Sequence, residues 1–545
     1  MTYKNPILYL DYSDPDVIRV GEDYYMVASS FCNAPGLPLL HSKDLVNWNV
    51  VNYVIDKIPT ERYNAPIHGC GVWAPAIRYH EGTYYVCFPM PDEGIYMTTA
   101  TDPFGKWSEP VNIRPGAGWI DPCPFWDDDG NAYLVAGVAK SRIGYKSVLH
   151  LVRMQPDGMG LYGEEVRIYD GNLLGQETIE GPKMYKRNGY YYIFAPAGGV
   201  KPGWQTVLRS KNIWGPYETR VVMRQGKSEV NGPHQGAWID TVTGEDWFIH
   251  FQDVFAAGRI VHLQPMYWEN DWPVIGVKSD EANEYGEPVN EYRMPDTGYQ
   301  GKIEPVPVAE EYSDYFKNNV SANGYAENDD KCDSSKVTYN MHWQWNANYD
   351  KNWYDAGETG LKLYAVPKEK EKALSDVSNL LLKKWFAPEF VSEIAMDFSN
   401  LNEGDSAGVI SLGVEYGAIV VEKLNGELII KGVRGTQIFN GVNVSTSEDE
   451  LVLGKAMGNR LIFRYEVITK PGDEIEIEGV VRPHETIRMS YREADDTSGS
   501  FAVACEYKAV AGRWVGVKYG VFCCGAEDVA ADARGYAVVE YVKVK

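Results

Sequence analysis

Three acidic residues occupy the same position in a short repeated pattern and could carry out proton transfer together. Asp14 and Asp121 each stand directly before a proline, and Glu180 stands one residue further from its proline. Two carboxyl groups that share a site cannot both stay ionised cheaply, so the pKa of one rises and that group remains an acid near neutral pH. The pattern therefore predicts acid–base chemistry, provided that the fold brings the three residues to one place.

Paired carboxyl groups of this kind meet the requirement for glycoside hydrolysis. One carboxylic acid protonates the leaving oxygen, and one carboxylate activates a water molecule. The alternative is that an acidic residue before a proline only forms a turn or a cap. That alternative stays open for any single residue, but three equivalent positions in a repeat favour the chemical interpretation.

The repeat that carries these residues occurs five times in the first 280 residues. Its copies are spaced by roughly 45 to 60 residues, close to the range typical of propeller blades. Each copy is followed by a turn with Gly or acidic residues and then by an aromatic strand, which is the pattern of a hairpin. Four strands in each of five units predict a five-bladed β-propeller. The copies begin at Asp14, Trp73, Asp121, Glu180 and Gly232.

The propeller would position the acidic residues. The innermost strand of each blade runs along the central channel, and its first residues open into the channel mouth. Asp14, Asp121 and Glu180 should therefore face one cavity from three blades. Stretches with the period of a helix are nearly absent before residue 300, which disfavours a parallel α/β fold.

The second half of the chain has a different character. Residues 277–312 are rich in Glu, Pro and Gly and indicate an extended connector. From about residue 313, strand patterns with frequent turn signals predict a β-sandwich. The chain is thus predicted to be all-β, with a propeller at residues 1–300, a linker at 301–312 and a sandwich at 313–545.

Residues 404–408 match the G-x-S-x-G motif of serine hydrolases. That motif needs a strand before it and a helix after it. A strand-like run follows here, so we interpret these residues as a hairpin turn.

Aromatic side chains crowd the inner strands and the nearby loops and could bind sugar. The C–H faces of sugars stack on aromatic rings, and a small pocket lined in this way suits a pentose or a hexose. Packing between blades is the alternative and explains most of the aromatic residues. The candidates for sugar contact are Phe31, Trp73, Trp119, Phe125 and Trp204.

His234 and Arg259 are two further candidates. His234 takes the fifth repeat position, where it is either a satisfied core residue or holds water around a central cation. Arg259 either tunes an acid and binds sugar hydroxyl groups or forms a surface salt bridge.

Composition excludes several kinds of partner. The formal net charge of −24 disfavours nucleic acid and anionic lipid. No apolar run is long enough to span a membrane. The N-terminus lacks the pattern of a signal peptide, so we expect a cytoplasmic protein, or an extracellular or periplasmic one if an export signal was removed. The eight cysteines form no C-x-x-C motif and are predicted to be reduced, buried thiols.

The motifs around the three acidic residues resemble those of glycoside hydrolase family 43, whose members have a five-bladed propeller and hydrolyse with inversion. The segments at Asp14, Asp121 and Glu180 are similar to the strands that carry the general base, the third acid and the general acid of that family. The resemblance therefore implies that Asp14 is the base, that Glu180 is the acid, and that Asp121 orients the acid and tunes its pKa. Residues 41–48 and 71–75 add further motifs in the same order.

The resemblance also bears on the remaining candidates. The segment at His234 is similar to a histidine segment near a central, water-coordinated ion, often calcium, and Arg259 matches an arginine that completes the sugar pocket. No cofactor is implied for the chemistry itself. Asp16 departs from the family, which more often has a small residue there. A regular strand would place Asp16 on the same face as Asp14, so Asp16 is a rival for the role of base.

The second half resembles the appended concanavalin-like jelly roll of two-domain β-xylosidases and α-L-arabinofuranosidases, through residues 344–353 and 404–408. In relatives, this domain packs against the propeller and can close one side of the pocket. The implied function is exo-acting, inverting release of terminal α-L-arabinofuranosyl or β-D-xylosyl units from hemicellulose oligosaccharides. Inversion predicts that the carboxyl groups of Asp14 and Glu180 lie about 6.5–9.5 Å apart.

Two alternatives remain. An endo-acting arabinanase would need an open groove, against which the sandwich and the Trp-rich residues 343–353 argue. A non-catalytic carbohydrate-binding propeller would not need the complete set of acidic residues. The preferred sugar and the oligomeric state do not follow from the residues.

Overall fold

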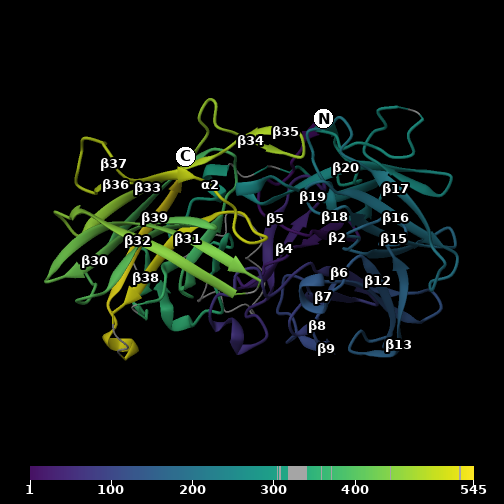
Figure 1. Cartoon of the computed structure of the whole chain (residues 1–545), viewed down its shortest axis with the longest axis horizontal. Helices are drawn as coiled ribbons and strands as arrows, with labels where there is room; N and C mark the ends of the chain where they lie inside the picture. Colours follow the sequence, from purple (N-terminus) through teal and green to yellow (C-terminus); the bar gives the residue numbers. More distant parts are fainter. Residues whose placement is uncertain are drawn as a thin grey trace.

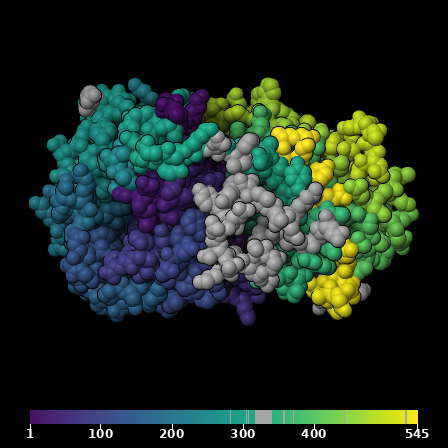
Figure 2. Space-filling view, turned by 180° about the vertical axis from the view of Figure 1, so that it is seen from behind, coloured from purple at the N-terminus to yellow at the C-terminus, as the bar shows by residue number. Residues whose placement is uncertain are grey.

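The computed structural model describes residues 1–280, 282–303, 305, 308–316, 340–356, 359–369, 371–441, 443–526 and 530–545. Two β-rich domains lie side by side (Figure 1; Figure 2), the N-terminal one coloured purple to teal and the C-terminal one green to yellow. The all-β class is confirmed. The α-helices among the described residues are α1 (Lys140–Ile143) and α2 (Val308–Glu311), and no helix there is long and apolar enough to cross a bilayer.

The N-terminal domain is a five-bladed propeller, as predicted. Each blade is a four-stranded antiparallel sheet whose strands pair in chain order. The strands of the five blades are β2 (Asp16–Val20), β3 (Asp23–Val27), β4 (Gly36–Ser42) and β5 (Asn49–Ile55); β6 (Ala76–His80), β7 (Thr83–Met90), β8 (Gly94–Ala100) and β9 (Val111–Pro115); β10 (Trp119–Trp126), β11 (Ala132–Val138), β12 (Val148–Met154) and β13 (Leu161–Asp170); β14 (Lys183–Arg187), β15 (Tyr190–Ala197), β16 (Trp204–Ser210) and β17 (Glu218–Met223); and β18 (His234–Asp240), β19 (Asp246–Asp253), β20 (Arg259–Glu269) and β21 (Trp272–Ile275).

Tight turns explain why the first two strands of a blade pair. Asn188 and Gly189 join β14 to β15 with φ angles of 49° and 76°. Two consecutive left-handed residues are the signature of a type I′ turn, which Asn and Gly adopt readily. The strand that follows, β15, buries most of its side chains. Turn chemistry and the aromatic run together therefore specify the hairpin.

The N-terminal segment ties the first blade to the fifth. β1 (Thr2–Lys4) pairs with β22 (Glu291–Arg293). The Asn5 side chain donates to the carbonyl group of Leu263 at 2.8 Å and accepts from its N–H at 2.9 Å. Residues 277–312 are thus not an extended connector throughout, because β22 belongs to the closure of the ring and α2 lies inside the predicted linker.

The C-terminal domain has two large sheets, and the sandwich is confirmed. The first sheet has the order β23-β27-β38-β29-β30-β31-β32, with β26 beside β38, and the second has the order β24-β25-β39-β28-β33-β36-β37. The strands of the first sheet are β23 (Trp343–Trp345), β26 (Val366–Pro367), β27 (Leu381–Lys384), β29 (Ser406–Leu412), β30 (Glu415–Leu424), β31 (Glu427–Asn440), β32 (Asn443–Lys455) and β38 (Lys518–Gly525). Those of the second are β24 (Tyr354–Ala356), β25 (Leu361–Tyr364), β28 (Phe390–Asp397), β33 (Arg460–Ile468), β36 (Thr486–Glu493), β37 (Ala502–Lys508) and β39 (Tyr536–Val544).

Residues 404 and 405 precede β29 and residues 406–408 begin it, so the motif runs into a strand rather than a helix. This agrees with the rejection of a serine nucleophile. The predicted hairpin turn is wrong, however, because β28 and β29 belong to different sheets. The segment crosses from one sheet of the sandwich to the other.

The two domains share one continuous apolar core. It includes Leu10 and Ala257 from the propeller together with Trp345 and Tyr519 from the sandwich. The hairpin of β34 (Glu474–Ile477) and β35 (Val480–Pro483), at the top of Figure 1, adds a polar contact to the propeller. There, Arg482 donates to the carbonyl group of Glu229 at 2.5 Å.

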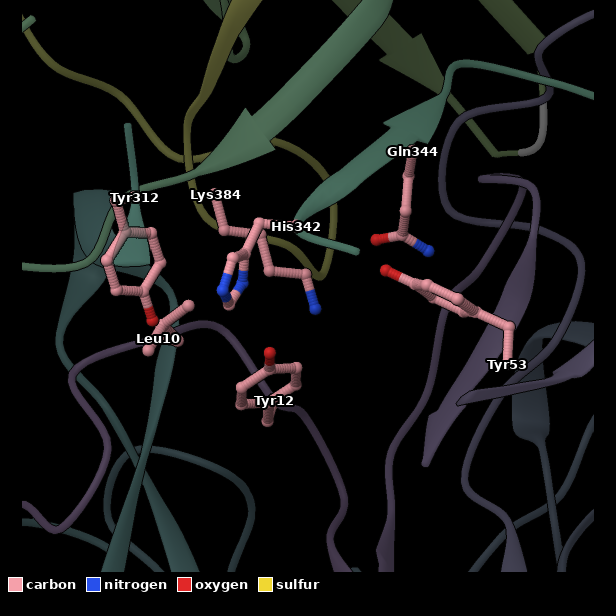
Figure 3. A pocket seen from close by; sticks show the side chains of 7 residues that line it. All are labelled: Leu10, Tyr12, Tyr53, Tyr312, His342, Gln344 and Lys384. Carbon is pink, nitrogen blue, oxygen red and sulfur yellow. The ribbon is translucent and has the colours of Figure 1, made fainter. Parts of the chain in front are cut away.

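A second polar contact between the domains surrounds Lys384. Its ammonium group donates to the carbonyl group of Asp11 at 2.8 Å and lies 4.2 Å from the ring centroid of Tyr12 (Figure 3). The adjoining cavity measures only about 10 Å³, which is room for a single water molecule. This cavity fills a gap in the interface and is too small for a sugar.

Seven cysteines lie among the described residues, and all seven are free thiols. Six of them are buried, and Cys505 is half-buried. Cys332 lies outside the described residues.

Candidate active site

The three acidic residues stand at or just before the inner strands of blades 1, 3 and 4. Asp14 lies two residues before β2, Asp121 lies at a bulge of β10, and Glu180 lies three residues before β14. Asp14 and Asp121 have left-handed backbone conformations, with φ angles of 57° and 55°. Such a conformation costs a residue other than glycine about 1 kcal/mol or more. Its occurrence at two equivalent positions before proline points to a functional constraint on where these carboxyl groups lie.

Asp14 is held by two polar partners. Ser29 Oγ donates to Asp14 Oδ2 at 2.6 Å, and Arg259 Nη1 lies 3.3 Å from Asp14 Oδ1. Both members of the Asp14–Arg259 pair are buried. The predicted proximity of Arg259 to an acidic residue is therefore present, and both carboxyl oxygens have fixed directions.

Asp121 interacts electrostatically with both of the other acidic residues. Its Oδ2 accepts from the Gly181 N–H at 2.7 Å and from Gln235 Nε2 at 3.1 Å, and only 2% of the residue is exposed. Burial, together with the negative charges of Glu180 and Asp14, raises the pKa of Asp121 to about 7. The three carboxyl groups thus converge, and the site retains a carboxylic proton near neutral pH.

Glu180 is the member of the trio that reaches solvent. Its side chain is 24% exposed, and its Oε1 lies 2.8 Å from His234 Nε2. His234 is fully buried, and its Nδ1 has no hydrogen-bond partner among the described residues. The structure places His234 beside the predicted general acid, where it fixes the direction of the carboxyl group.

A cavity of about 300 Å³ is lined by Arg259, the residue that contacts Asp14, although none of the three acidic residues lines it. The propeller contributes Val200, Lys201 and Phe255, and the opposite wall is residues 511–515 of the sandwich. Such a volume is at the lower end of the range for small-ligand pockets. It therefore suits the end of a short ligand.

The wall made by residues 511–515 was not predicted. Trp514 is 45% exposed, and its ring centroid lies 5.8 Å from the Arg259 guanidinium. Residues 343–353, which were predicted to close the pocket, do not line this cavity, and Trp345 pairs instead with Ala34 of the propeller. No local motif in residues 511–515 marks them, since their contact partners lie some 250 positions earlier in the chain.

Asp11 is the residue that holds this wall in place, and sequence reasoning also missed it. One oxygen of its buried carboxyl group accepts from the Arg259 N–H at 2.9 Å and from Ser13 Oγ at 3.1 Å. The other accepts from the Gly516 N–H at 2.9 Å. Gly258 and Gly516 also approach so closely that a Cβ on either would lie within 2.6 Å of a neighbouring atom. Asp11 therefore links Arg259 to the sandwich.

We expect Asp11→Asn to raise KM and lower Tm together. An amide group retains only one acceptor oxygen, so one N–H of Arg259 or Gly516 loses its partner, which costs about 1–3 kcal/mol. Detachment of the 511–515 wall then weakens substrate binding. The matched control is Asp56→Asn, which removes the carboxylate that accepts from Tyr349 at 2.5 Å across the same domain interface but does not line the cavity. An Asp11→Asn protein with a lowered Tm and an unchanged KM would contradict this coupling.

Two of the five predicted sugar-binding aromatic residues lie together near the mouth. Phe31 follows Ser29 by two residues, and its ring centroid is 6.5 Å from that of Trp73. Trp73 Nε1 donates to the carbonyl group of Gly69 at 3.1 Å. A Cβ at Gly69 would lie 2.7 Å from Arg513 Cδ, so this pair lies beside the sandwich wall. Their contact with substrate stays a prediction.

Trp119 and Phe125 are packing residues, which corrects their predicted role. Trp119 is buried, stacks on His150 at 5.5 Å and has the Arg114 guanidinium 3.9 Å from its ring centroid. Phe125 lies four positions beyond Asp121 along β10 and contacts Tyr191 edge-on at 6.2 Å. The rings of Trp119 and Phe125 therefore pack within and between blades.

Trp204 lies on the Glu180 side of the site. Its Nε1 donates to Gln176 Oε1 at 2.9 Å. The preceding residue, Gly203, approaches His234 so closely that a Cβ there would lie 3.0 Å from Nδ1. This position is compatible with the predicted sugar contact, which stays a prediction.

Asp16 lies deeper in the channel and is a clamp between blades. Its Oδ2 accepts from the Ile77 N–H at 2.8 Å and from Arg78 Nη1 at 2.6 Å, and the residue is fully buried. The left-handed conformation of Asp14 breaks the strand alternation on which the rivalry between the two residues rested. Asp16 is thus tied to Arg78 and is not available as a base.

The channel side chains do not fit a calcium ion. Calcium takes six to eight oxygen ligands. Asp16 is already paired with Arg78, and Lys183 adds a second cationic group nearby, since its neighbour Met184 and Arg78 both donate to Cys123 Sγ. Among the described residues, no group of three or more His, Cys, Asp or Glu side chains could hold a metal. We therefore do not identify His234 as a metal ligand.

Comparisons with known proteins agree with this arrangement. Residues 3–273 match the family model of glycosyl hydrolases family 43, and residues 333–545 match that of the β-xylosidase C-terminal concanavalin A-like domain. A putative β-xylosidase of Xylanibacter ruminicola is 42% identical over 386 residues, which cover 70% of this chain and 66% of the relative. A xylosidase/arabinosidase of Butyrivibrio fibrisolvens is 32% identical over 295 residues, covering 50% and 56%.

The solved structures give the same result. A bifunctional GH43-CE protein of Bacteroides eggerthii is 27% identical and superimposes with a TM-score of 0.76, over 99% of this chain and 63% of that one. The chain thus spans about two thirds or less of the length of these three relatives. Because the two family models match in order and together account for both domains, the chain belongs to glycosyl hydrolases family 43 and carries the C-terminal domain of its β-xylosidases.

Proposed function

We propose that this protein is an exo-acting, inverting glycoside hydrolase that releases terminal β-D-xylosyl or α-L-arabinofuranosyl units from hemicellulose oligosaccharides. The observation that carries the proposal is the convergence of Asp14, Asp121 and Glu180, together with Arg259, which contacts Asp14 and lines a walled cavity. The names of the relatives, β-xylosidase and xylosidase/arabinosidase, support both sugars.

The proposed reaction is a single displacement. Asp14 takes a proton from a water molecule, whose oxygen forms a bond to the anomeric carbon. The glycosidic C–O bond breaks on the opposite face, and Glu180 donates its proton to the leaving oxygen. At the end Asp14 is protonated and Glu180 is ionised, and solvent exchange resets both. Asp121 orients the site.

Arg259 and His234 act as orienting groups in this scheme. Arg259 fixes Asp14 at 3.3 Å and presents the rest of its guanidinium group to the cavity. His234 fixes Glu180 at 2.8 Å. No step uses a cofactor, and calcium in the channel is not part of the proposal, because the donor set does not suit it.

The sandwich wall favours exo action over endo action. Residues 511–515 stand across the cavity, whereas an endo-acting arabinanase must accept a chain that continues in both directions. A purely binding propeller is disfavoured because the left-handed Asp14 and Asp121 would carry a conformational cost with no chemical use.

Proton NMR of the first-formed sugar tests the proposal. We expect a β-xyloside to yield α-xylose first, before mutarotation, which corresponds to carboxyl groups about 6.5–9.5 Å apart. Release of β-xylose first would contradict inversion. Initial rates on p-nitrophenyl β-D-xyloside and p-nitrophenyl α-L-arabinofuranoside then establish the preferred sugar, and a protein that releases nitrophenol from neither would contradict the activity.

A further inference from the structure

The channel layer deeper than the acidic trio contains a buried ammonium group that no step has used so far. Lys183 is the first residue of β14 and is only 1% exposed. Its Nζ has no hydrogen-bond partner among the described residues. An ionised group taken out of water without a partner costs several kcal/mol. We therefore expect the positive charge of Lys183 to stabilise a negatively charged group nearby.

The groups around Lys183 show which negatively charged group its charge can stabilise. Its own strand neighbour Met184 donates to Cys123 Sγ at 3.3 Å, which places Lys183 against β10, two residues beyond Asp121. The positive charge of Lys183 partly opposes the rise that burial causes in the pKa of Asp121 and of Cys87. Asp121 is thus an acidic group of the trio with which Lys183 interacts electrostatically.

The other charged groups nearby are already committed to partners. Asp16 pairs with Arg78 at 2.6 Å, Asp14 pairs with Arg259 at 3.3 Å, and Glu180 contacts His234 at 2.8 Å. Within the described part of the chain, Asp121 accepts from the neutral donors Gly181 and Gln235. Among the charged groups named here, Lys183 is the cation left to balance Asp121.

Two further polar atoms in this layer lack partners. Asp16 Oδ1 and Gln235 Oε1 are buried and have no hydrogen-bond partner among the described residues. Both atoms are hydrogen-bond acceptors, and acceptor oxygens are the atoms expected around a cation. The layer therefore resembles a cation site in which the charge comes from a side chain.

We propose that the ammonium group of Lys183 is the resident cation of the propeller channel, in place of a metal ion, and that it is a positioning residue which keeps the proton of the acidic trio on Glu180 by holding Asp121 as a carboxylate. This inference rests on the proposed function. If Asp121 took up the proton instead, Glu180 would be ionised and could not protonate the leaving group.

The test compares Lys183→Met with Lys183→Arg and with a matched control, Lys186→Met. Lys186 lies on the same strand but pairs with Asp127 and Asp128 at the outer surface. We expect Lys183→Met to move the acidic limb of the pH profile of kcat/KM upward by about one pH unit or more, since one unit corresponds to a tenfold change in an equilibrium. At neutral pH we expect kcat to fall about tenfold with little change in KM, whereas Lys183→Arg and Lys186→Met keep the wild-type limb.

Three results would overturn the inference. The first is a folded Lys183→Met protein, checked by circular dichroism, whose acidic limb coincides with that of the wild type, because a merely structural lysine would lower Tm alone. Lys183→Gln serves as the second neutral variant should the Met variant not fold. The second is an acidic limb in Lys183→Arg that moves as far as in Lys183→Met.

The third result concerns the wild-type protein and needs no variant. We expect its Tm and activity to be unchanged by EDTA or by added CaCl₂, and calorimetric titration with CaCl₂ to give no binding heat. Calcium dependence would show that the channel holds a metal after all. Wild-type protein that hydrolyses neither aryl glycoside would refute the proposed function, whereas an active wild type with one of the three results above refutes only the role of Lys183.

Discussion

Replacement of Glu180 by Gln is expected to lower kcat/KM for xylobiose by about 10²–10⁴-fold, the usual contribution of a general acid or base. An amide group of the same shape keeps the contact to His234 but has no acidic proton to give. A nitrophenolate leaves without a proton, so kcat for p-nitrophenyl β-D-xyloside should fall much less. The diagnostic quantity is therefore the ratio of the two losses, measured at one pH.

The control for this variant is Glu177→Gln. Glu177 is an exposed acidic residue in the same loop, three positions before Glu180. Its replacement should leave both substrates unaffected. Equal losses on xylobiose and on the aryl xyloside in Glu180→Gln would mean that Glu180 does not protonate the leaving group.

Replacement of Asp14 by Asn is expected to lower kcat by about 10²–10⁴-fold on both substrates alike. The base acts on water, so a better leaving group gives no relief. Asn tolerates a left-handed backbone as Asp does, and its amide can still bond to Ser29 Oγ, so Tm should change little. The measurement is the pair of kcat values together with thermal unfolding of each protein.

The contrast with Asp16→Asn separates the base from its sequence neighbour. Asp16 holds the backbone of Ile77 and the guanidinium group of Arg78, and breaking one side of a buried ion pair is strongly destabilising. We therefore expect Asp16→Asn to lower Tm with a smaller loss of kcat per folded molecule. Wild-type turnover in Asp14→Asn, or an intact Tm with abolished turnover in Asp16→Asn, would reverse the two assignments.

Most of the fold could be predicted from the repeat pattern, because the residues that specify each hairpin are close together in the sequence. Turn pairs such as Asn188-Gly189 select hairpins over a few residues, and the acidic residues appear at one position of a unit that recurs. Symmetry then brings distant positions together without further information. The convergence of Asp14, Asp121 and Glu180 could be predicted for this reason.

The features that were missed depend on contacts across long sequence separations. Whether an aromatic ring contacts sugar or a neighbouring blade depends on which residues pack against it. Trp119, for example, packs against His150 and Arg114. The left-handed backbone at Asp14 argues against Asp16 as the general base, but no feature of the local sequence marks that conformation. The wall at residues 511–515 and its link to Asp11 join segments about 500 positions apart.

That link has a consequence for biosynthesis. Domains generally fold as they emerge from the ribosome, N-terminal first. The propeller strands end at Ile275, yet the Gly516 amide that donates to Asp11 is synthesised about 240 positions later. A nascent or prematurely terminated chain can thus assemble its ring and its acidic groups while one flank of the pocket is still missing. Full competence should emerge only after Gly516 has been synthesised, so polypeptides truncated ahead of residue 511 would lack the wall that helps to retain a short sugar.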